Sequence, residues 1–231
     1  MRIDKFIGNN SNLSRSLIHL AIKRGQVKRN GEIITKTNTS MNDGDAISLK
    51  DKIIEAIYSR YLMLHKPAGY LCANSDSEHS TVLDLIDIPR KETLQIAGRL
   101  DIDTTGLVLL TDDGQWNHQV TSPKKSCTKS YLVTTADPIR EDTAALFLQG
   151  ILLRGETKVT LPARLTLTNT HQAQLEIQEG KYHQVKRMFA AVGNKVTVLH
   201  RERIGIIELD PQLTAGNYRE LTASEIASFN N

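Results

Sequence analysis

Apolar residues recur along the chain with two periods, and each period predicts a different kind of element. Alternating or continuous apolar runs of strand length predict β-strands at 61–64, 107–111, 129–135, 164–167, 174–177 and 195–199. Helical spacing predicts one amphipathic helix through Val185, Met188, Phe189 and Val192. Shorter helices are predicted at 82–86, 115–120 and 142–149. The polar–apolar alternation of the strands favours an α+β domain, with a mixed, mostly antiparallel sheet and helices packed against it.

The first 50 residues predict a smaller unit with its own helix and short strands. Ser14 is the N-cap of a helix that runs to about Arg24, with Gly25 as its stop. The apolar positions expected to face a core are Leu13, Leu17, Ala21 and the adjacent Ile18. Turns are expected at 30–31, between two strands of a hairpin, and at 43–45, before a strand at 46–49. Residues 50–60 resemble a linker or a short helix, so the predicted domains are 1–58 and 59–231.

Positive charge is concentrated in this smaller unit. Residues 1–36 contain eight Lys or Arg residues and two acidic residues, a local net charge of +6 in a chain of net charge +3. On the predicted helix, Arg15, His19 and Lys23 recur every four residues on a face away from the apolar one. Such an arrangement predicts an electrostatic contact with a polyanion.

Composition and motifs argue against several classes of protein. Cys72 and Cys127 have no metal-ligand spacing and predict no disulfide framework, which fits a reducing cytoplasm. The seven His residues form no HxxxH pattern, and no glycine-rich phosphate loop is present. No apolar run reaches membrane-spanning length, and the first ten residues lack a signal core. We therefore expect a cytoplasmic monomer without a metal, a cofactor or a membrane contact.

The stretch 98–114, GRLDIDTTGLVLLTDDG, has an unusual density of acids ahead of an apolar strand. Its Asp101 and Asp103 permit three hypotheses: a turn built by short acids, a calcium loop, or a catalytic carboxylate activated by a nearby cation. The calcium hypothesis fits poorly, because Leu109 takes position nine and Asp112, instead of a Glu, takes position twelve.

Further candidate residues lie at the ends of predicted elements. Lys66 follows a strand and precedes a Pro-x-Gly turn, and Tyr131 lies within the strand at 129–135. Lys186 and Arg187 lie at the start of a helix, where cations oppose the helix dipole. This mismatch predicts an anionic partner for them, either an internal carboxylate or RNA.

Two sets of motifs resemble known families. MRIDKFI, LSRSLIHLAIKRGQVKRNGEII and NDGDAISL resemble the RNA-binding domain of ribosomal protein S-four, over about the first 50 residues. HKPAG, GRLDIDTTGLVLLTDDG, KSY and EGKYHQVKRMF, in that order, resemble the pseudouridine synthases. Within that family the chain is similar to the branch that modifies ribosomal RNA of the small subunit.

The resemblance implies the site and the reaction. Asp101 matches the family's catalytic carboxylate, Tyr131 its active-site tyrosine and Lys186 the basic residue that pairs with the carboxylate. Asp103 is expected to shape the loop, and 112–114 to turn the chain. Isomerisation of uridine to pseudouridine gains no atoms and changes no oxidation state, so no cofactor is implied. The implied substrate is small-subunit (16S) ribosomal RNA, within an assembly intermediate.

Two other functions stay open at this point: a synthase for large-subunit ribosomal RNA, and a non-catalytic RNA-binding assembly factor. Several cations are expected to contact RNA, mainly at phosphates. They are Arg2, Lys5, Arg15, Lys23, Arg24, Lys28, Arg29, Lys66, Arg99, His183, Arg187, Arg201 and Arg203.

Overall fold

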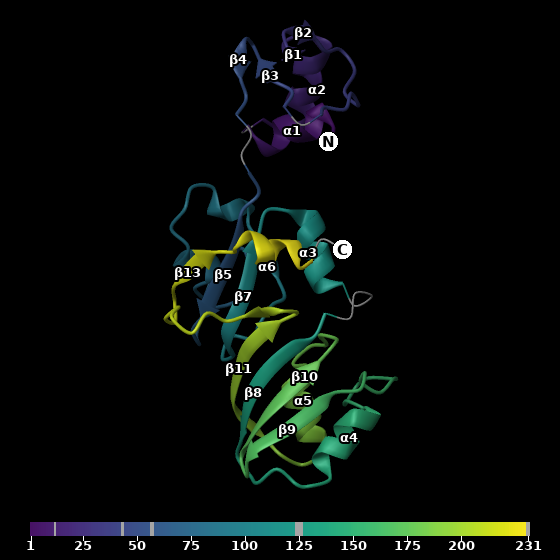
Figure 1. The fold of residues 1–231 in the computed structure, drawn as a ribbon, viewed down its shortest axis with the longest axis vertical. Helices are drawn as coiled ribbons and strands as arrows, with labels where there is room; N and C mark the ends of the chain where they lie inside the picture. The colour runs from purple at the N-terminus through teal and green to yellow at the C-terminus, as the bar shows by residue number, and fades with distance from the viewer. Residues whose placement is uncertain (12, 43, 56–57, 123–126, 230–231) are drawn as a thin grey trace. The chain divides into compact units, whose positions relative to one another are not determined.

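In the computed structural model the chain divides into two compact units, residues 1–58 and 59–231 (Figure 1). The structure describes all residues except 12, 43, 56–57, 123–126 and 230–231. No helix among the described residues is long and apolar enough to cross a bilayer.

The first unit packs two helices against a four-stranded antiparallel sheet in the order β2-β1-β3-β4. Its elements are α1 (Ile3–Asn9), α2 (Arg15–Lys23), β1 (Val27–Arg29), β2 (Glu32–Ile33), β3 (Ile47–Leu49) and β4 (Lys52–Ile53). Its core consists of apolar side chains from both layers: Ile3, Phe6, Ile7, Ile18, Ala21, Ile22, Val27 and Ile47. Burial of these aliphatic groups holds the small unit together.

Local signals in this unit are mostly confirmed. Ser14 accepts a hydrogen bond from the backbone N–H of Leu17 at 3.4 Å, as expected of an N-cap. The hairpin turn at 30–31 is present. Leu17 is 51% exposed, so its predicted core position is wrong: α2 turns its Ile18, Ala21 and Ile22 inward. Residues 52–53 form β4 instead of a helix, and the turn predicted at 43–45 begins outside the described residues.

The second unit is built on a nine-stranded sheet whose main path is β13-β5-β7-β11-β8-β10-β9. The path strands are β5 (Tyr61–Lys66), β7 (Thr105–Thr111), β8 (Lys129–Thr135), β9 (Arg164–Asn169), β10 (Gln172–Ile177), β11 (Val196–Ile204) and β13 (Tyr218–Glu220). Off this path, β6 (Gln95–Ala97) pairs with β7, and β12 (Ile207–Glu208) pairs with β11. All of these pairs are antiparallel except β7–β11, which is parallel. The predicted α+β fold with a mixed, mostly antiparallel sheet is confirmed.

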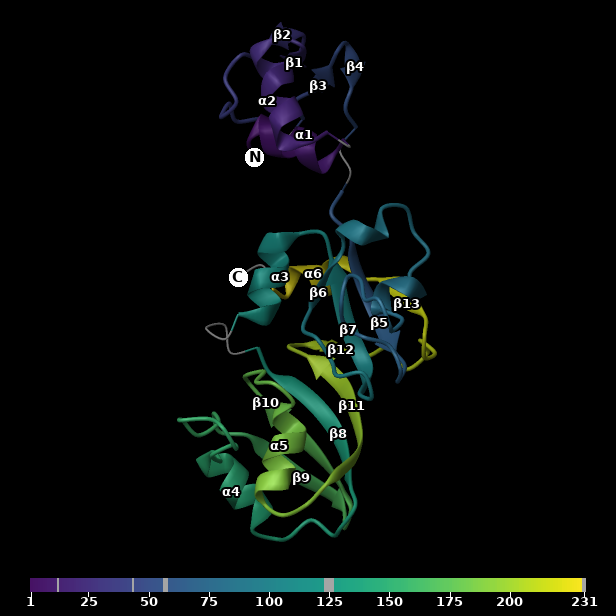
Figure 2. The same cartoon turned by 180° about the vertical axis from the view of Figure 1, so that it is seen from behind.

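Helices cover the sheet in two places. They are η1 (Val82–Leu85), η2 (Lys91–Thr93), α3 (Gly114–Thr121), α4 (Thr143–Gln149), α5 (Gln184–Ala191) and α6 (Ala223–Ala227). Figure 2 shows α5 lying over β8, β10 and β9, with α4 beside it. Their contact includes Phe147 and Phe189, whose rings meet edge to face at 5.2 Å. A second apolar cluster joins α3 and α6 to the middle of β7 and the end of β11.

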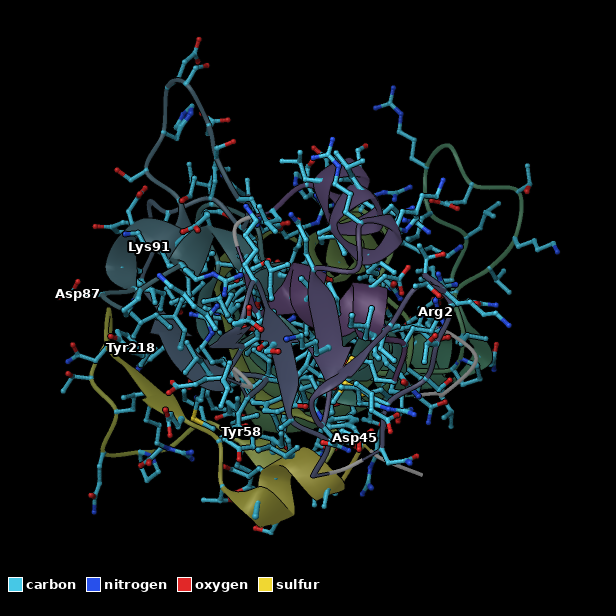
Figure 3. The ribbon with its side chains drawn as sticks, turned by 90° about the horizontal axis from the view of Figure 1, so that it is seen from above. Arg2, Asp45, Tyr58, Asp87, Lys91 and Tyr218 are labelled. Atoms are coloured by element: carbon cyan, nitrogen blue, oxygen red, sulfur yellow. The ribbon has the colours of Figure 1, made fainter. Side chains whose placement is uncertain are left out.

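The C-terminal segment is fastened to the body of this unit by polar contacts. The indole N–H of the buried Trp116 donates to the carbonyl of Ile226 at 3.0 Å. The hydroxyl of Tyr218 donates to the carbonyl of Asp87 at 3.1 Å and accepts from its N–H at 3.3 Å (Figure 3). A capping box of Thr222 and Glu225 is present at the start of α6.

Candidate active site

A buried lysine, Lys66, binds the backbone of the loop that leads into β7. The Lys66 ammonium donates to the carbonyls of Pro67, Ile102 and Thr104, at 3.0, 3.1 and 2.8 Å. Its side chain is 0% exposed, and burial lowers the pKa of Lys66. The prediction that Lys66 contacts RNA is therefore wrong, because all its donors are directed at the backbone of the protein's own loop.

A buried arginine holds the other end of the same loop. Nε of Arg201 donates to the Leu107 carbonyl at 2.9 Å, and Nη2 donates to the Gly98 carbonyl at 2.6 Å. Nη1 lies 3.4 Å from both the Arg99 carbonyl and the Tyr131 hydroxyl. At 1% exposure Arg201 has no access to a phosphate, so the prediction of an RNA contact is wrong.

Arg203, two residues further along β11, also has partners within the protein. One guanidinium nitrogen pairs with the carboxylate of Glu176, and another donates to the Gly205 carbonyl at 2.7 Å. Its side chain is 26% exposed, so its role as an RNA contact stays a prediction.

Close backbone packing fixes where Arg201 enters the site. Gly106 on β7 is the register partner of Arg201 on β11, in the only parallel pair among the described strands. Gly106 has φ +107°, and a Cβ there would lie 2.2 Å from the Arg201 carbonyl oxygen. Only glycine allows the backbones of β7 and β11 to come this close. The contact pairs β7, which follows the loop, with β11, which carries Arg201.

The predicted pairing of Asp101 with Lys186 is found. Lys186, in the first turn of α5, places its ammonium 3.1 Å from Oδ2 of Asp101. His183, just before α5, places Nε2 3.5 Å from Oδ1 of the same carboxylate. Two elements far apart in sequence, the loop before β7 and the start of α5, thus bring a carboxylate between an ammonium and an imidazole.

Asp103 is a member of this cluster that the sequence interpretation assigned only to loop shape. Its Oδ1 lies 2.5 Å from the Lys186 ammonium, whereas Oδ2 of Asp101 lies 3.1 Å from it. The hydrogen bond from Lys186 lowers the pKa of Asp103. Partial burial alone would lower the pKa of Lys186, but hydrogen bonds to Asp103 and Asp101 outweigh it and raise the net value. Lys186 therefore stays charged, and the D-x-D spacing ahead of the strand was the signal for a shared cation.

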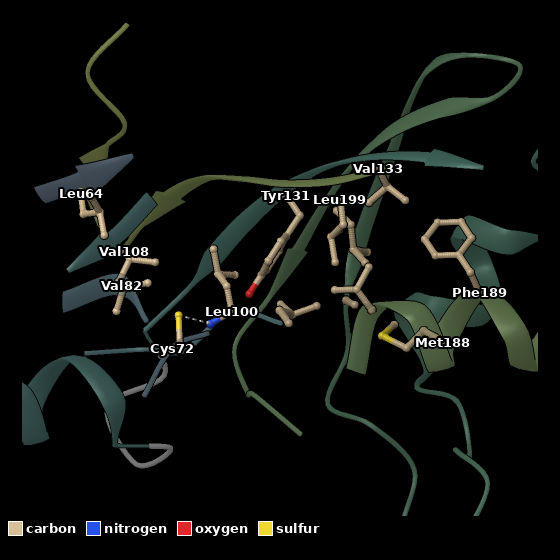
Figure 4. Packing of buried hydrophobic residues seen from close by; sticks show 14 of the residues in the cluster. Leu64, Cys72, Val82, Leu100, Val108, Tyr131, Val133, Met188, Phe189 and Leu199 are labelled. Atoms are coloured by element: carbon tan, nitrogen blue, oxygen red, sulfur yellow. Dashed lines mark hydrogen bonds between the residues drawn. The ribbon is translucent and has the colours of Figure 1, made fainter. Parts of the chain in front are cut away.

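Tyr131 joins the site from β8. It is 7% exposed, and Figure 4 shows its hydroxyl directed toward Leu100, the residue before the candidate carboxylate. The backbone N–H of Leu100 donates to the Cys72 thiol at 3.2 Å. Because Nη1 of Arg201 lies 3.4 Å from both the Tyr131 hydroxyl and the Arg99 carbonyl, the tyrosine and the loop share one anchor.

Comparison with known proteins shows the family of the chain. The family model for RNA pseudouridylate synthase matches residues 60–191, a range that includes Asp101, Tyr131 and Lys186. The chain belongs to the RNA pseudouridylate synthase family. The ribosomal small subunit pseudouridine synthase A of Haemophilus influenzae is 51% identical over 98% of each chain. The protein of the same name from Escherichia coli is 48% identical over 99% of each chain.

A crystal structure of a pseudouridylate synthase aligns with a TM-score of 0.73, at 50% identity and 99% coverage of each chain. The chain is thus a pseudouridine synthase, an isomerase that acts on RNA. Among its described residues, no group of three or more His, Cys, Asp or Glu side chains gathers to hold a metal ion.

The remaining cations predicted to contact RNA fall into two groups in this synthase. Several are engaged: Arg2 pairs with Asp4, Lys28 with Asp51 and Arg187 with Glu156, and Arg29 donates to the Ser40 carbonyl. Others are exposed on the surface of their own unit: Lys5, Arg15, Lys23, Arg24 and Arg99. The second group has charge available for phosphates.

Proposed function

We propose that this synthase converts a uridine of small-subunit (16S) ribosomal RNA into pseudouridine, with Asp101 as its nucleophile. The observation that carries the proposal is the Asp101 carboxylate held 3.1 Å from the Lys186 ammonium. The substrate follows from similarity, because relatives at 48% and 51% identity are named small-subunit synthases. A large-subunit substrate is the alternative within the same chemistry.

The proposed mechanism uses groups of this chain alone. Lys186 places its positive charge 3.1 Å from the Asp101 carboxylate, and the carboxylate attacks the target nucleotide. The attack forms a bond between the carboxylate and the nucleotide, and the N1–C1′ bond breaks. Uracil then turns within the site, a C5–C1′ bond forms, the bond to the carboxylate breaks to regenerate Asp101, and N1 takes up a proton. The C5 proton is then removed, with Tyr131 beside the base assisting that transfer. The target base leaves its stack to reach the carboxylate, as in other enzymes that act on a base.

The first unit is proposed to dock the enzyme on structured RNA, as the S-four resemblance implies. Exposed cations on or beside its two helices, including Lys5, Arg15 and Lys23, would contact phosphates. Docking of this kind selects a site while the second unit performs the reaction. We further propose that the enzyme acts as a monomer in the cytoplasm, on an assembly intermediate of the small subunit.

Tritium release tests the reaction and the substrate together. Unmodified 16S and 23S transcripts with 5-tritiated uridine are incubated with the wild type, Asp101→Asn and Asp103→Asn. We expect release from 16S RNA by the wild type, none by Asp101→Asn, and reduced release by Asp103→Asn, whose lysine contact weakens. Release by Asp101→Asn refutes the nucleophile, and release from 23S RNA alone favours the large-subunit alternative.

A further inference from the structure

An exposed pair of stacked rings lies beside the candidate carboxylate, and the reaction described above does not use it. Tyr182 and His183 have ring centroids 3.8 Å apart and planes inclined by 19°. Tyr182 is 75% exposed, so one face of its ring rests on His183 and the other is open. A large aromatic ring left so exposed contributes little to the core, which points to a contact with a partner.

The turn that carries the two rings is held in place by buried and charged side chains. Gln184, which is buried, accepts from the Lys181 N–H at 2.8 Å and donates to the Glu179 carboxylate at 2.8 Å. Arg187 donates to the Tyr182 carbonyl at 3.0 Å and to the Glu156 carboxylate at 3.2 Å. The rings therefore start from a fixed backbone, which lowers the entropy lost when a ligand binds.

Backbone conformation adds to this picture. His183 adopts φ +47°, a left-handed conformation that is uncommon for residues other than glycine. The conformation comes immediately before α5 and puts the imidazole between the Tyr182 ring and the Asp101 carboxylate. A strained residue in this position fits a site that must be shaped before the ligand arrives.

The position of the stack determines what covers it. Imidazole Nε2 of His183 is 3.5 Å from Asp101, and the Tyr182 ring is stacked directly on that imidazole. When the target nucleotide meets the carboxylate, the RNA beside that nucleotide must pass over this surface. Lys181 and Arg187 both pair with the carboxylate of Glu156 beside this surface.

We propose that the open face of Tyr182 binds an unpaired nucleobase next to the target uridine, an inference that rests on the proposed RNA substrate. Unstacked bases in RNA loops bind proteins by stacking on exposed aromatic rings. When the target base leaves its stack, its neighbour loses a stacking partner, and Tyr182 supplies a replacement. The platform thus binds the substrate in its opened form.

Binding and kinetics with the free 16S transcript test this platform. The variants are Tyr182→Ala, Tyr182→Leu and Tyr182→Phe, in the full-length chain. Filter binding gives Kd, and tritium release gives KM and kcat. Tyr58→Ala is the matched control, because Tyr58 is also exposed, at 87%, and makes no ring contact among the described residues.

We expect Kd and KM to rise about 5- to 100-fold for Tyr182→Ala, the range for loss of one base–aromatic stack. Tyr182→Leu should show most of that loss, because it keeps an apolar group but no aromatic face. Tyr182→Phe and Tyr58→Ala should stay within about twofold, and kcat at saturating RNA should change little in every variant.

An unchanged Kd for Tyr182→Ala overturns the platform, as does a loss that Tyr182→Phe reproduces in full. A loss seen only when ribosomal proteins are present also overturns it, since the ring then contacts a protein. The absence of tritium release by the wild type would refute the proposed function. In that case the comparison of Kd values would still test whether Tyr182 binds RNA.

Discussion

Arg201→Lys is the substitution that tests whether the buried arginine positions the catalytic loop. The change keeps the positive charge but replaces a planar group of five N–H donors by one ammonium. In the native chain two short bonds, to Leu107 at 2.9 Å and Gly98 at 2.6 Å, leave the guanidinium in different directions. A single ammonium cannot hold both carbonyls and also the two contacts at 3.4 Å.

The cost follows from the bonds that are lost. A hydrogen bond to a charged donor contributes about 1.5–3 kcal/mol, and a buried carbonyl without a partner costs about 1–3 kcal/mol. Losing one of the two short bonds should therefore lower the free energy of unfolding by about 2–4 kcal/mol. Release of the Gly98 carbonyl also frees the loop that carries Asp101, and a shift of about 1 Å costs about 100-fold in rate.

Arg60→Lys is the matched control. Arg60 donates to the Asp112 carboxylate and to the Pro89 carbonyl, at 2.8 and 2.5 Å, but it does so at the far end of β7. Both variants should lose stability in urea unfolding. Circular dichroism at 25 °C should show that both variants are folded. Under these conditions only Arg201→Lys should have a lower kcat, with little change in its Kd for RNA. A wild-type kcat in Arg201→Lys refutes the positioning role and leaves a structural one.

Three further changes test the site and the fold. Lys186→Met should lower kcat about 100-fold with an unchanged fold, because the proposed nucleophile Asp101 and the neighbouring Asp103 lose their shared cation; a wild-type tritium-release rate would contradict this. Gly106→Ala should destabilise by on the order of 4 kcal/mol in urea unfolding, whereas Gly69→Ala, with positive φ but open space, should cost about 1–2 kcal/mol; equal losses would refute the packing argument. Glu225 has its pKa lowered from 4.5 to about 2, chiefly by its hydrogen bonds with Arg219. Because the folded-state pKa is depressed, Glu225→Gln should lose up to about 3 kcal/mol above pH 5, and this difference should vanish as the pH falls toward 2; a difference that persists at pH 2 would contradict the ion-pair origin.

Local patterns were sufficient for elements whose signal is complete within the element. The strand at Lys129–Thr135 was predicted with both ends, since β-branched residues and Tyr131 fill it and Asp137-Pro138 follows it. By contrast β11 was predicted to end at Leu199 but continues to Ile204. The second half of β11 is HRERI, and a run of charged residues usually marks the end of a strand. Here the strand continues because partners elsewhere in the fold bind these charged side chains.

The same limit explains the errors among the predicted RNA contacts. Sequence gives the charge of Lys66 and Arg201 but not the direction of their donors. Both are buried against carbonyl groups that come from loops 30 or more residues away, and no local pattern encodes such a partner. The pairing of Lys186 with Asp101 was predicted from the family resemblance. The helix start alone, which disfavours a cation, indicated an anionic partner but did not decide between a carboxylate and RNA.

The acids of the 98–114 stretch, similar in sequence, have separate partners in the structure. Asp101 and Asp103 share Lys186, while Asp112 pairs with Arg60 at 2.8 Å. Asp113 caps α3, accepting from its first backbone N–H groups at 2.9 and 3.2 Å, and also accepts from a tyrosine hydroxyl at 2.8 Å. The expectation that 112–114 only turns the chain is therefore wrong.

These contacts act at opposite ends of one buried strand. The carboxylates after β7 fix its far end to Arg60 and α3, and Lys66 and Arg201 fix the loop before it. Because β7 is buried along most of its length, a constraint at either end is transmitted through a rigid element. The proposed nucleophile, Asp101, thus projects from a loop whose two supports are buried cations, while Lys186 approaches it from a separate helix. It follows that Lys186 sets the charge of the site, and that the buried cations set its geometry.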